Sequence, residues 1–411
     1  ILVALALLLL LGGSVLGGGP RSQVAWESVR AVAFESDDWG LAGFSPTAAA
    51  WDGLDRSSLD TGRFPAVYWL STLESRQDVK ALNLVLAAVR DRNGHPAVMQ
   101  PNYIMSSLER VEGRWVARDL PELPTAYLRP GLWPEVAAAI RAGTWYPELH
   151  GAWHYDPDMR RAAALADELA REVTARGIML FPGSERAREL GSWRSLAELE
   201  AELDHSLAVF EALFGRPPGS VIAPDYHWSD RIETMWSTRD LRVIQGKREQ
   251  INPDWGHGRT GRLVKYLRRH WDRWIHPERS YLERNCRLEA GQAADPDAVV
   301  RQCLTATRQA WAGGQPAIVE THRVNFVHLD RKVSASGLAA LRSYLAEITE
   351  GPDNSPTFLT GMEIAQLSAT GTSWCVRGDR VVVRNATRAR RIVAVPASAV
   401  AQAGGEDPLA A

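Results

Sequence analysis

The chain has few cysteines, and their number and spacing exclude two kinds of stabilising site. The 411 residues include only Cys286, Cys303 and Cys375, too few for a disulfide framework. None of them belongs to a Cys-x-x-Cys pair, the spacing typical of cysteine-based metal sites. One disulfide with one free thiol stays open for an oxidising compartment, but we expect three inert packing residues.

A strong excess of charge is also missing. The formal net charge is −2, which predicts no strong attraction to nucleic acid or to an anionic membrane surface. Two short basic clusters, at residues 265–273 and 388–391, are interpreted as solvated faces. We therefore expect no nucleic-acid partner, and the sequence leaves the oligomeric state open.

Apolar runs of transmembrane length are missing as well. Residues 1–11 form a continuous apolar run, shorter than the ~20 residues that a spanning helix needs. Small residues follow it, as in a signal peptide. No cysteine lies near this run, which argues against a lipid-modified N-terminal cysteine. We expect residues 1–20 to be a signal peptide or an N-terminal anchor. If this segment is not cleaved, residues 1–16 are expected to anchor the protein to the membrane. The expected location is secreted, periplasmic or cell-envelope associated.

Two adjacent carboxylates follow the first apolar run of the mature chain. Residues 31–34 are apolar and predict a buried strand, and Asp37 and Asp38 stand at its end. Because side chains alternate faces along an extended chain, the two carboxylates should point in different directions. One is then able to bind a metal while the other acts as a base. The alternative is a simple turn with a helix cap, since aspartate favours both.

A pair of histidines supplies the ligand type that the aspartates lack. His150 and His154 are four residues apart and converge if the stretch is helical or tightly turned. The alternative is two imidazoles hydrogen-bonded to backbone. Together with Asp38 they form a three-ligand set that leaves coordination positions open, the pattern of catalytic rather than structural sites. The combination favours a metal site.

The alternation of short apolar strands with helices along the rest of the chain indicates a parallel α/β fold. Candidate site residues stand at the ends of expected strands, where α/β barrels place their chemistry: Asp37, Asp38, His150, Asp225 and His322. The expected helices occupy residues 78–92, 134–141, 159–176, 195–214, 295–311 and 336–350, and further strands occupy 97–100, 178–181, 220–223 and 317–320.

The motifs, in their order, resemble those of NodB-like polysaccharide deacetylases (carbohydrate esterase family 4). The resemblance covers residues 31–367 and consists of Phe-x-x-Asp-Asp-x-Gly around Asp37, His-x-x-x-His from His150, and a strand ending at His322. It implies an irregular (β/α)7-type barrel and one divalent ion, zinc by preference, on Asp38, His150 and His154. It also implies that Asp37 is the general base and His322 the general acid.

The chain departs from the family at one motif. Residues 224–228 fall where the family carries an arginine that steadies the base, and no arginine stands there. We consider Arg284 and Arg323 as its replacements; the alternative is an altered activity. Tryptophans that flank the motifs, Trp39, Trp153 and Trp228, either stack on a sugar or pack the barrel mouth. The expected substrate-binding residues are Trp39, Asp225, Trp228, Arg284, Arg323 and Asn325.

We divide the chain into three parts. The segment 1–20 precedes a deacetylase-like barrel at residues 21–370, and residues 371–411 form a short β-rich extension. Alternating patterns at 373–376, 380–384 and 391–395 predict three strands, which either dock on the barrel or begin a truncated domain. Residues 252–288 lack periodicity and are interpreted as an excursion over the barrel mouth.

The expected function is metal-assisted hydrolysis of N- or O-linked acetyl groups on a polysaccharide or glycan. Three rivals remain open at this point. A glycoside hydrolase would pair Asp37 with a second carboxylate such as Asp225. A non-catalytic sugar-binding relative would bind metal without turnover. An iron oxygenase would use two histidines and one carboxylate, but the lack of β-rich patterning around the ligands speaks against it.

Overall fold

The computed structural model describes residues 24–404, apart from residues 56, 60–65, 185, 248–251, 253–275, 352–354 and 388. The expected signal peptide or anchor at residues 1–20, the basic cluster at 265–273 and most of the excursion at 252–288 lie outside the described residues. Among the helices of the described part, none combines the length and the apolarity that crossing a membrane requires.

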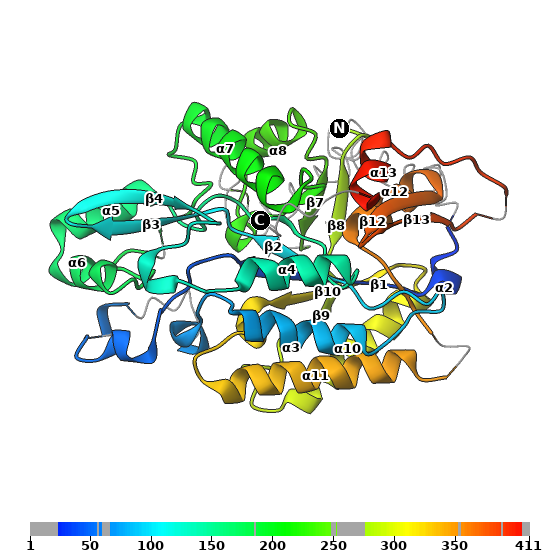
Figure 1. The fold of residues 1–411 in the computed structure, drawn as a ribbon, viewed down its shortest axis with the longest axis horizontal. Coiled ribbons are helices and arrows are strands. Elements are labelled where there is room, and N and C mark those ends of the chain that lie inside the picture. Colours follow the sequence, from blue (N-terminus) through cyan, green and yellow to red (C-terminus); the bar gives the residue numbers. More distant parts are fainter. Residues whose placement is uncertain are drawn as a thin grey trace, which may run out of the picture.

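A curled parallel sheet, flanked by helices, forms the centre of the molecule (Figure 1). Its strands run in the order β8-β7-β6-β5-β2-β1-β10-β9, with β11 also paired to β1. This confirms the α/β class and the barrel-like curl, with nine strands in place of about seven. The bounds are β1 (Ala31–Trp39), β2 (Met99–Tyr103), β5 (Glu148–Leu149), β6 (Ser220–Val221), β7 (Val243–Gly246), β8 (Ser280–Glu283), β9 (Cys286–Arg287), β10 (Ala317–His322) and β11 (Thr357–Phe358).

The two edge strands of this sheet are consecutive in the chain. Only Arg284 and Asn285 separate β8 from β9, although the two strands lie at opposite ends of the strand order. The link therefore crosses the open side of the curl. Its arginine is placed where it can reach the strands in the middle of the sheet.

The helices cover the sheet, and several of them begin at side-chain caps. Ser75, Ser195 and Thr360 each form a capping box with the acidic residue three positions later. The bounds are α2 (Trp26–Val29), α3 (Arg76–Ala87), α4 (Leu132–Arg141), α5 (Pro157–Ala166), α6 (Glu168–Ala175), α7 (Leu196–Phe214), α8 (Asp230–Ser237), α10 (Pro296–Ala312), α11 (Arg331–Thr349), α12 (Gly361–Thr370) and α13 (Ala397–Gly404). Short 3-10 turns are η1 (Ala48–Trp51), η2 (Ser57–Leu59), η3 (Ala66–Leu70), η4 (Thr125–Tyr127), η5 (Pro224–Tyr226) and η6 (Arg323–Asn325).

Two local predictions are wrong. The helix expected at residues 159–176 is two helices, because Asp167 takes an extended conformation and its side chain caps α6 by accepting from Ala170 N. The strand expected at 178–181 is buried but belongs to no sheet. Its apolar side chains pack in a separate core cluster that includes Ala170 and Val173 of α6. An apolar run of this length indicates burial and leaves the type of element undecided.

Two antiparallel hairpins lie outside the central sheet. One pairs β3 (Ser106–Val111) with β4 (Arg114–Asp119), and the other pairs β12 (Thr372–Arg377) with β13 (Arg380–Asn385). The second hairpin docks on the barrel, because Arg377 and Arg384 both pair with Glu363 of α12. The third expected strand, at 391–395, is absent: residues 391–396 have no regular structure and α13 follows.

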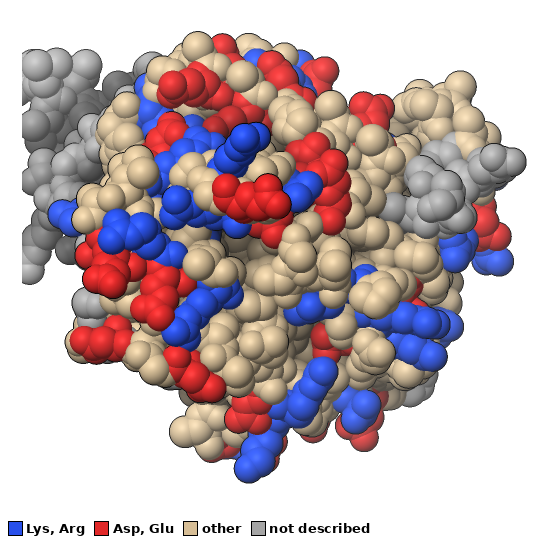
Figure 2. Space-filling view, turned by 60° about the vertical axis from the view of Figure 1, so that its left-hand side comes forward, with Lys and Arg blue, Asp and Glu red and all other residues tan. Residues whose placement is uncertain are grey.

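All nine residues of β1 are buried, which places the candidate site at the end of a core strand. The ring of Phe34 packs edge-on against Tyr344 of α11, with centroids 5.8 Å apart. On the face shown in Figure 2, acidic and basic side chains are interspersed, in keeping with the net charge of −2. The polar residues of β1 are therefore exceptions that call for a local explanation.

Candidate metal centre and catalytic site

The register between two central strands brings the first site residues together. Asp37 of β1 is the pairing partner of His322 of β10 in the parallel ladder. Each stands at the carboxyl end of its strand, the edge at which open α/β sheets and barrels bind ligands. His150 follows β5 at the same edge.

Asp37 and Asp38 diverge because the backbone turns between them. Asp38 has a positive φ of 72°, and the pairing of β1 with β2 shifts register between Ser36 and Trp39. The expected alternation of faces is therefore reinforced by a bulge, which re-aims a side chain at a strand end. The two carboxylates have separate sets of partners.

Asp38, His150 and His154 form a compact group of possible metal ligands, with their ligand atoms all within 4.8 Å of one another. Oδ1 of Asp38 lies 3.4 Å from Nε2 of His150 and 3.1 Å from Nε2 of His154. Ligands that share one zinc ion at about 2.0–2.2 Å in tetrahedral geometry stand roughly 3.3–3.6 Å apart; the distance to His150 falls in this range, and the distance to His154 is slightly shorter. All three side chains are buried.

An irregular turn, and not a helix, makes the two imidazoles converge. The Glu189 carboxylate accepts hydrogen bonds from the backbone N–H groups of Ala152, Trp153 and His154, at 2.6–3.0 Å. Gly151 has a φ of 107°, and a Cβ there would lie 2.8 Å from the Glu189 carboxylate oxygens. The turn therefore depends on a glycine and on a buried carboxylate that the motif does not contain.

The second nitrogen of His150 is fixed by the backbone. Nδ1 donates to the carbonyl of Ile222 at 3.2 Å, which leaves the lone pair of the neutral ring on Nε2, facing Asp38. Burial lowers the pKa of His150, but the negative charges of Asp37 and Asp38 outweigh it and raise the pKa above its ordinary value. The same charges attract a metal cation. The donor set and its orientation thus fit a divalent ion.

Asp37 is held by a buried arginine from the β8–β9 link. Nη1 and Nη2 of Arg284 donate to its two carboxylate oxygens at 2.6 and 2.7 Å, a bidentate pair, and Asn102 Nδ2 donates to Oδ1 at 2.7 Å. Burial raises the pKa of Asp37, but the pairing with Arg284 outweighs it and holds the pKa well below its usual value. Asp37 is therefore ionised at neutral pH.

A second carboxylate shares this arginine. Arg284 Nε donates to Glu35 Oε2 at 2.8 Å, and neither side chain is exposed to solvent. Burial raises the pKa of Glu35 to about 7, because Arg284 only partly offsets it. Glu35 and Asp37 lie two residues apart on β1, so they share one face of the strand. The N–H groups of Arg284 are thus all engaged by protein acceptors, and it orients Asp37, in place of the expected contact with substrate.

His322 is held by an acidic residue that the sequence did not reveal. Its Nδ1 lies 2.6 Å from Oε1 of Glu289, and its Nε2 lies 3.9 Å from Oδ2 of Asp37. Burial lowers the pKa of His322, but Glu289 outweighs it and the pKa rises to about 10. Asn325 Nδ2 donates to the other oxygen of Glu289 at 2.7 Å. Asn325 is buried and holds the partner of the imidazole, a different task from the expected contact with substrate.

Arg323 does not reach the base. It is fully buried, donates to the carbonyl of Leu41 and pairs with Glu74 at 3.1 Å. Glu74 in turn accepts from the backbone N–H of Gly40 at 3.0 Å. Arg323 therefore supports the chain just beyond Asp38, and its expected role toward substrate is corrected. Of the two arginines considered as replacements for the family's arginine, Arg284 is the one that contacts the base.

The flanking tryptophans belong to the core. Trp39 and Trp228 are 0% exposed, so neither has a ring face for a sugar, which corrects that expectation. Trp39 packs edge-on against Trp145 with ring centroids 4.8 Å apart, and Trp228 Nε1 donates to Glu233 at 2.8 Å. Trp153 is 8% exposed and is also buried.

Further polar groups that sequence reasoning missed line the same edge of the sheet. The Tyr226 hydroxyl accepts from Arg284 at 2.7 Å and donates to Glu320 at 3.0 Å, and Lys247 forms an ion pair with Glu320. Glu289, Glu320 and His322 form a second group with metal-ligand spacing, but Glu320 already has a lysine partner. Asp225 lies half-buried in η5, just beyond β6, with a φ of 55°.

Comparison with known proteins gives two distant structural likenesses and no sequence match. No protein-family model matches the chain, and no curated protein matches it. Among solved structures, a candidate polysaccharide deacetylase from Mycobacterium smegmatis is 14% identical with a TM-score of 0.39, covering 82% of this chain and 88% of that one. BA3943, a CE4 family pseudoenzyme from Bacillus anthracis, is 8% identical with a TM-score of 0.34, covering 78% and 61%. Likenesses at these TM-scores carry no argument, so the site stands on its own geometry.

Proposed function

We propose that the protein is a metal-dependent hydrolase that removes N- or O-linked acetyl groups from a glycan. The observation that carries the proposal is the separation of tasks at the end of β1. Asp38 faces two imidazoles, while Asp37 faces Arg284 and His322. A site for a Lewis acid, an ionised base and a cationic acid thus lie side by side, which is the set that acyl hydrolysis requires.

Asp38, His150 and His154 would hold the ion. A bound divalent ion, such as zinc, supplies polarisation of the acyl carbonyl and activation of water near neutral pH. The protein's contribution is to fix the three ligands. The backbone carbonyl of Ile222 orients His150, and Glu189 holds the turn that carries His154. Metal dependence and metal identity belong to this proposal.

In this proposal Asp37 takes the proton of the attacking water. Its two oxygens are fixed by Arg284 and Asn102, so its direction is set before substrate arrives. The same pairing keeps the pKa low and makes the carboxylate a weak base. Its efficiency therefore depends on a water molecule that is already acidified.

In this proposal His322 protonates the leaving nitrogen or oxygen. With a pKa raised to about 10, its ring carries both protons at neutral pH. Nδ1–H is engaged by Glu289, so Nε2–H is the proton that remains for transfer, on the side that faces Asp37. Asp37 and His322 thus stand on neighbouring strands, with Nε2 of His322 3.9 Å from Oδ2 of Asp37.

The test is acetate release from a panel of acetylated glycans by the zinc-loaded protein, with the Asp37→Asn variant as control. We expect release by the parent and a loss of roughly 10²–10⁴-fold in the variant. Release of sugar in place of acetate would indicate a glycoside hydrolase. Turnover that is equal in parent and variant would place the chemistry elsewhere, and a zinc-loaded parent without any turnover would indicate a sugar-binding relative.

We further propose, from residues 1–11 alone, that the protein is exported to the cell envelope or beyond. Fractionation of cells that express the full-length gene product tests this. Detection outside the cytosol is expected, and confinement to the cytosol would contradict it.

A further inference from the structure

A cavity borders the segments that follow the metal ligands Asp38 and His154 in the chain. It is bounded by residues 41–43 beyond Asp38, by the β3–β4 hairpin and by helices α5 and α6. It encloses about 530 Å³ of empty space, its solvent-open mouth included. About 70 Å³ of it is available to the centres of water-sized molecules, which is room for a small group such as a carboxylate.

The cavity contains a buried cation without an acidic partner. Arg160 of α5 is only 4% exposed, and no carboxylate of the described residues forms an ion pair with it; its guanidinium carbon lies 5.1 Å from the centre of the Tyr155 ring. Its Nη2 donates to the carbonyl of Ile178 at 3.0 Å, while Nε has no hydrogen-bond partner among the described residues. Burying a charged donor in this way costs free energy that a matching acceptor would offset.

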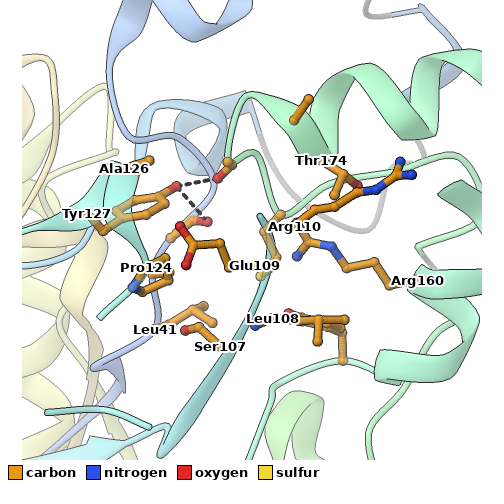
Figure 3. Close-up of a pocket in the computed structure, with 16 residues that line it drawn as sticks. Leu41, Ser107, Leu108, Glu109, Arg110, Pro124, Ala126, Tyr127, Arg160 and Thr174 are labelled. Carbon is orange, nitrogen blue, oxygen red and sulfur yellow. Dashed lines mark hydrogen bonds between the residues drawn. The ribbon is translucent and has the colours of Figure 1, made fainter. Parts of the chain in front are cut away.

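The guanidinium of Arg160 points into the cavity. Figure 3 shows it reaching from α5 toward the middle of the space, whereas the carboxylate of Glu109 turns the other way, toward Tyr127. Glu109 has partners of its own, Arg118 Nε at 2.9 Å and the backbone N–H of Thr125 at 2.8 Å. It is therefore not the counter-ion of Arg160.

A second polar group in the same cavity also lacks a partner. Thr174 of α6 is 6% exposed, and its hydroxyl has no hydrogen-bond partner among the described residues. A hydroxyl in a helix commonly donates to the carbonyl four residues earlier, but this one does not. Arg160 and Thr174 come from two different helices, so the cavity offers a guanidinium and a hydroxyl from separate elements.

We propose that this cavity is a binding site for a small ligand that carries a carboxylate. A guanidinium presents its N–H groups in a fork that matches a carboxylate, and Thr174 would donate to the same ligand or accept from a neighbouring hydroxyl. The site is separate from the proposed hydrolysis and does not depend on it.

Two sources of such a carboxylate are a free small acid and a uronic acid unit of a glycan. Calorimetric titration of the full chain with acetate, with glucuronate and with uncharged glucose separates them. Binding of acetate and glucuronate alike indicates a free-acid site, and binding of glucuronate alone indicates a sugar-acid site; glucose is expected not to bind. Absence of binding by both carboxylates, or equal binding of glucose, would overturn the proposal.

Variants locate the binding in this cavity. Arg160→Gln should raise the dissociation constant about 10- to 100-fold. Thr174→Val, which keeps the side-chain shape, should raise it about 3- to 10-fold. The matched control is Arg110→Gln. Arg110 lines the same cavity, but its Nε donates to the carbonyl of Gly113 and its guanidinium lies 6.0 Å from the centre of the Trp115 ring. The Arg110→Gln variant should therefore bind the carboxylate with unchanged affinity.

Three outcomes of the variant series are decisive. Loss in both Arg160→Gln and Thr174→Val with no change in Arg110→Gln supports the site. An equal loss of affinity in the Arg110 and Arg160 variants would show a general charge effect and refute the proposed site. Full affinity in Thr174→Val, a change that removes no charge, would also refute it. Binding must also persist in Asp38→Asn, because loss there would assign the carboxylate to the metal centre.

Discussion

Replacing Arg284 with methionine should destabilise the protein strongly, because one guanidinium serves two buried carboxylates. Arg284 donates to both oxygens of Asp37 and to Glu35, with all three side chains at most 2% exposed. Removing one partner of a buried ion pair costs about 3–5 kcal/mol, since the remaining charge is left uncompensated. Glu35 can escape by taking a proton, because its pKa is already about 7. The cost therefore falls mainly on Asp37.

The assay is urea unfolding at pH 7 of the parent, Arg284→Met and the double variant Asp37→Asn/Arg284→Met. We expect the single variant to lose about 3–5 kcal/mol and the double variant to regain most of it, because the second change removes the stranded charge. Acetate release should be lost in both. A single variant as stable as the parent would refute the argument that this arginine compensates buried charge. A double variant no more stable than the single one would refute the assignment to Asp37.

Two further predictions concern charge and pH. In Glu289→Gln we expect unchanged metal content and a lower rate of acetate release. Because Glu289 raises the pKa of His322 to about 10, the parent should be more stable than the variant. This stability difference should be full below about pH 6.5 and fade as pH rises toward 10. Urea unfolding at pH 6 and pH 9 measures this difference in the free energy of unfolding. A difference that is larger at pH 9 would contradict the prediction. Arg377 and Arg384 outweigh burial and lower the pKa of Glu363 from 4.5 to about 2, so Glu363→Gln should cost about 3 kcal/mol at pH 7. That difference should shrink as pH falls from about 4.5 toward 2 in denaturant titrations, and a constant difference would contradict the pairing.

The residues found from the sequence are those whose roles follow from local patterns. A strand end with two aspartates and a close histidine pair can be recognised from neighbours in the chain, and the structure brings Asp38, His150 and His154 together. Arg284 was one of two candidates for a missing arginine. The choice between it and Arg323 depends on which strand edges face each other, a property of the whole sheet.

The residues that were missed act through long-range register. Glu35 and Glu289 reach Arg284 and His322 only because β1, β10 and β9 are neighbours in the sheet. The one local signal for Glu289 is that it follows a short strand, the position at which the other candidates stand. Trp39 was misassigned because solvent exposure of a tryptophan is decided by packing and not by its place beside a motif.

The central claim is that the two adjacent aspartates have different tasks, Asp38 as metal ligand and Asp37 as base. Zinc bound per chain, measured by mass spectrometry on the parent, Asp37→Asn and Asp38→Asn after identical loading, tests it most directly. We predict one zinc in the parent, nearly one in Asp37→Asn and a large loss in Asp38→Asn, because a neutral amide is a poor zinc ligand. A site emptied by Asp37→Asn and kept full by Asp38→Asn would contradict the account.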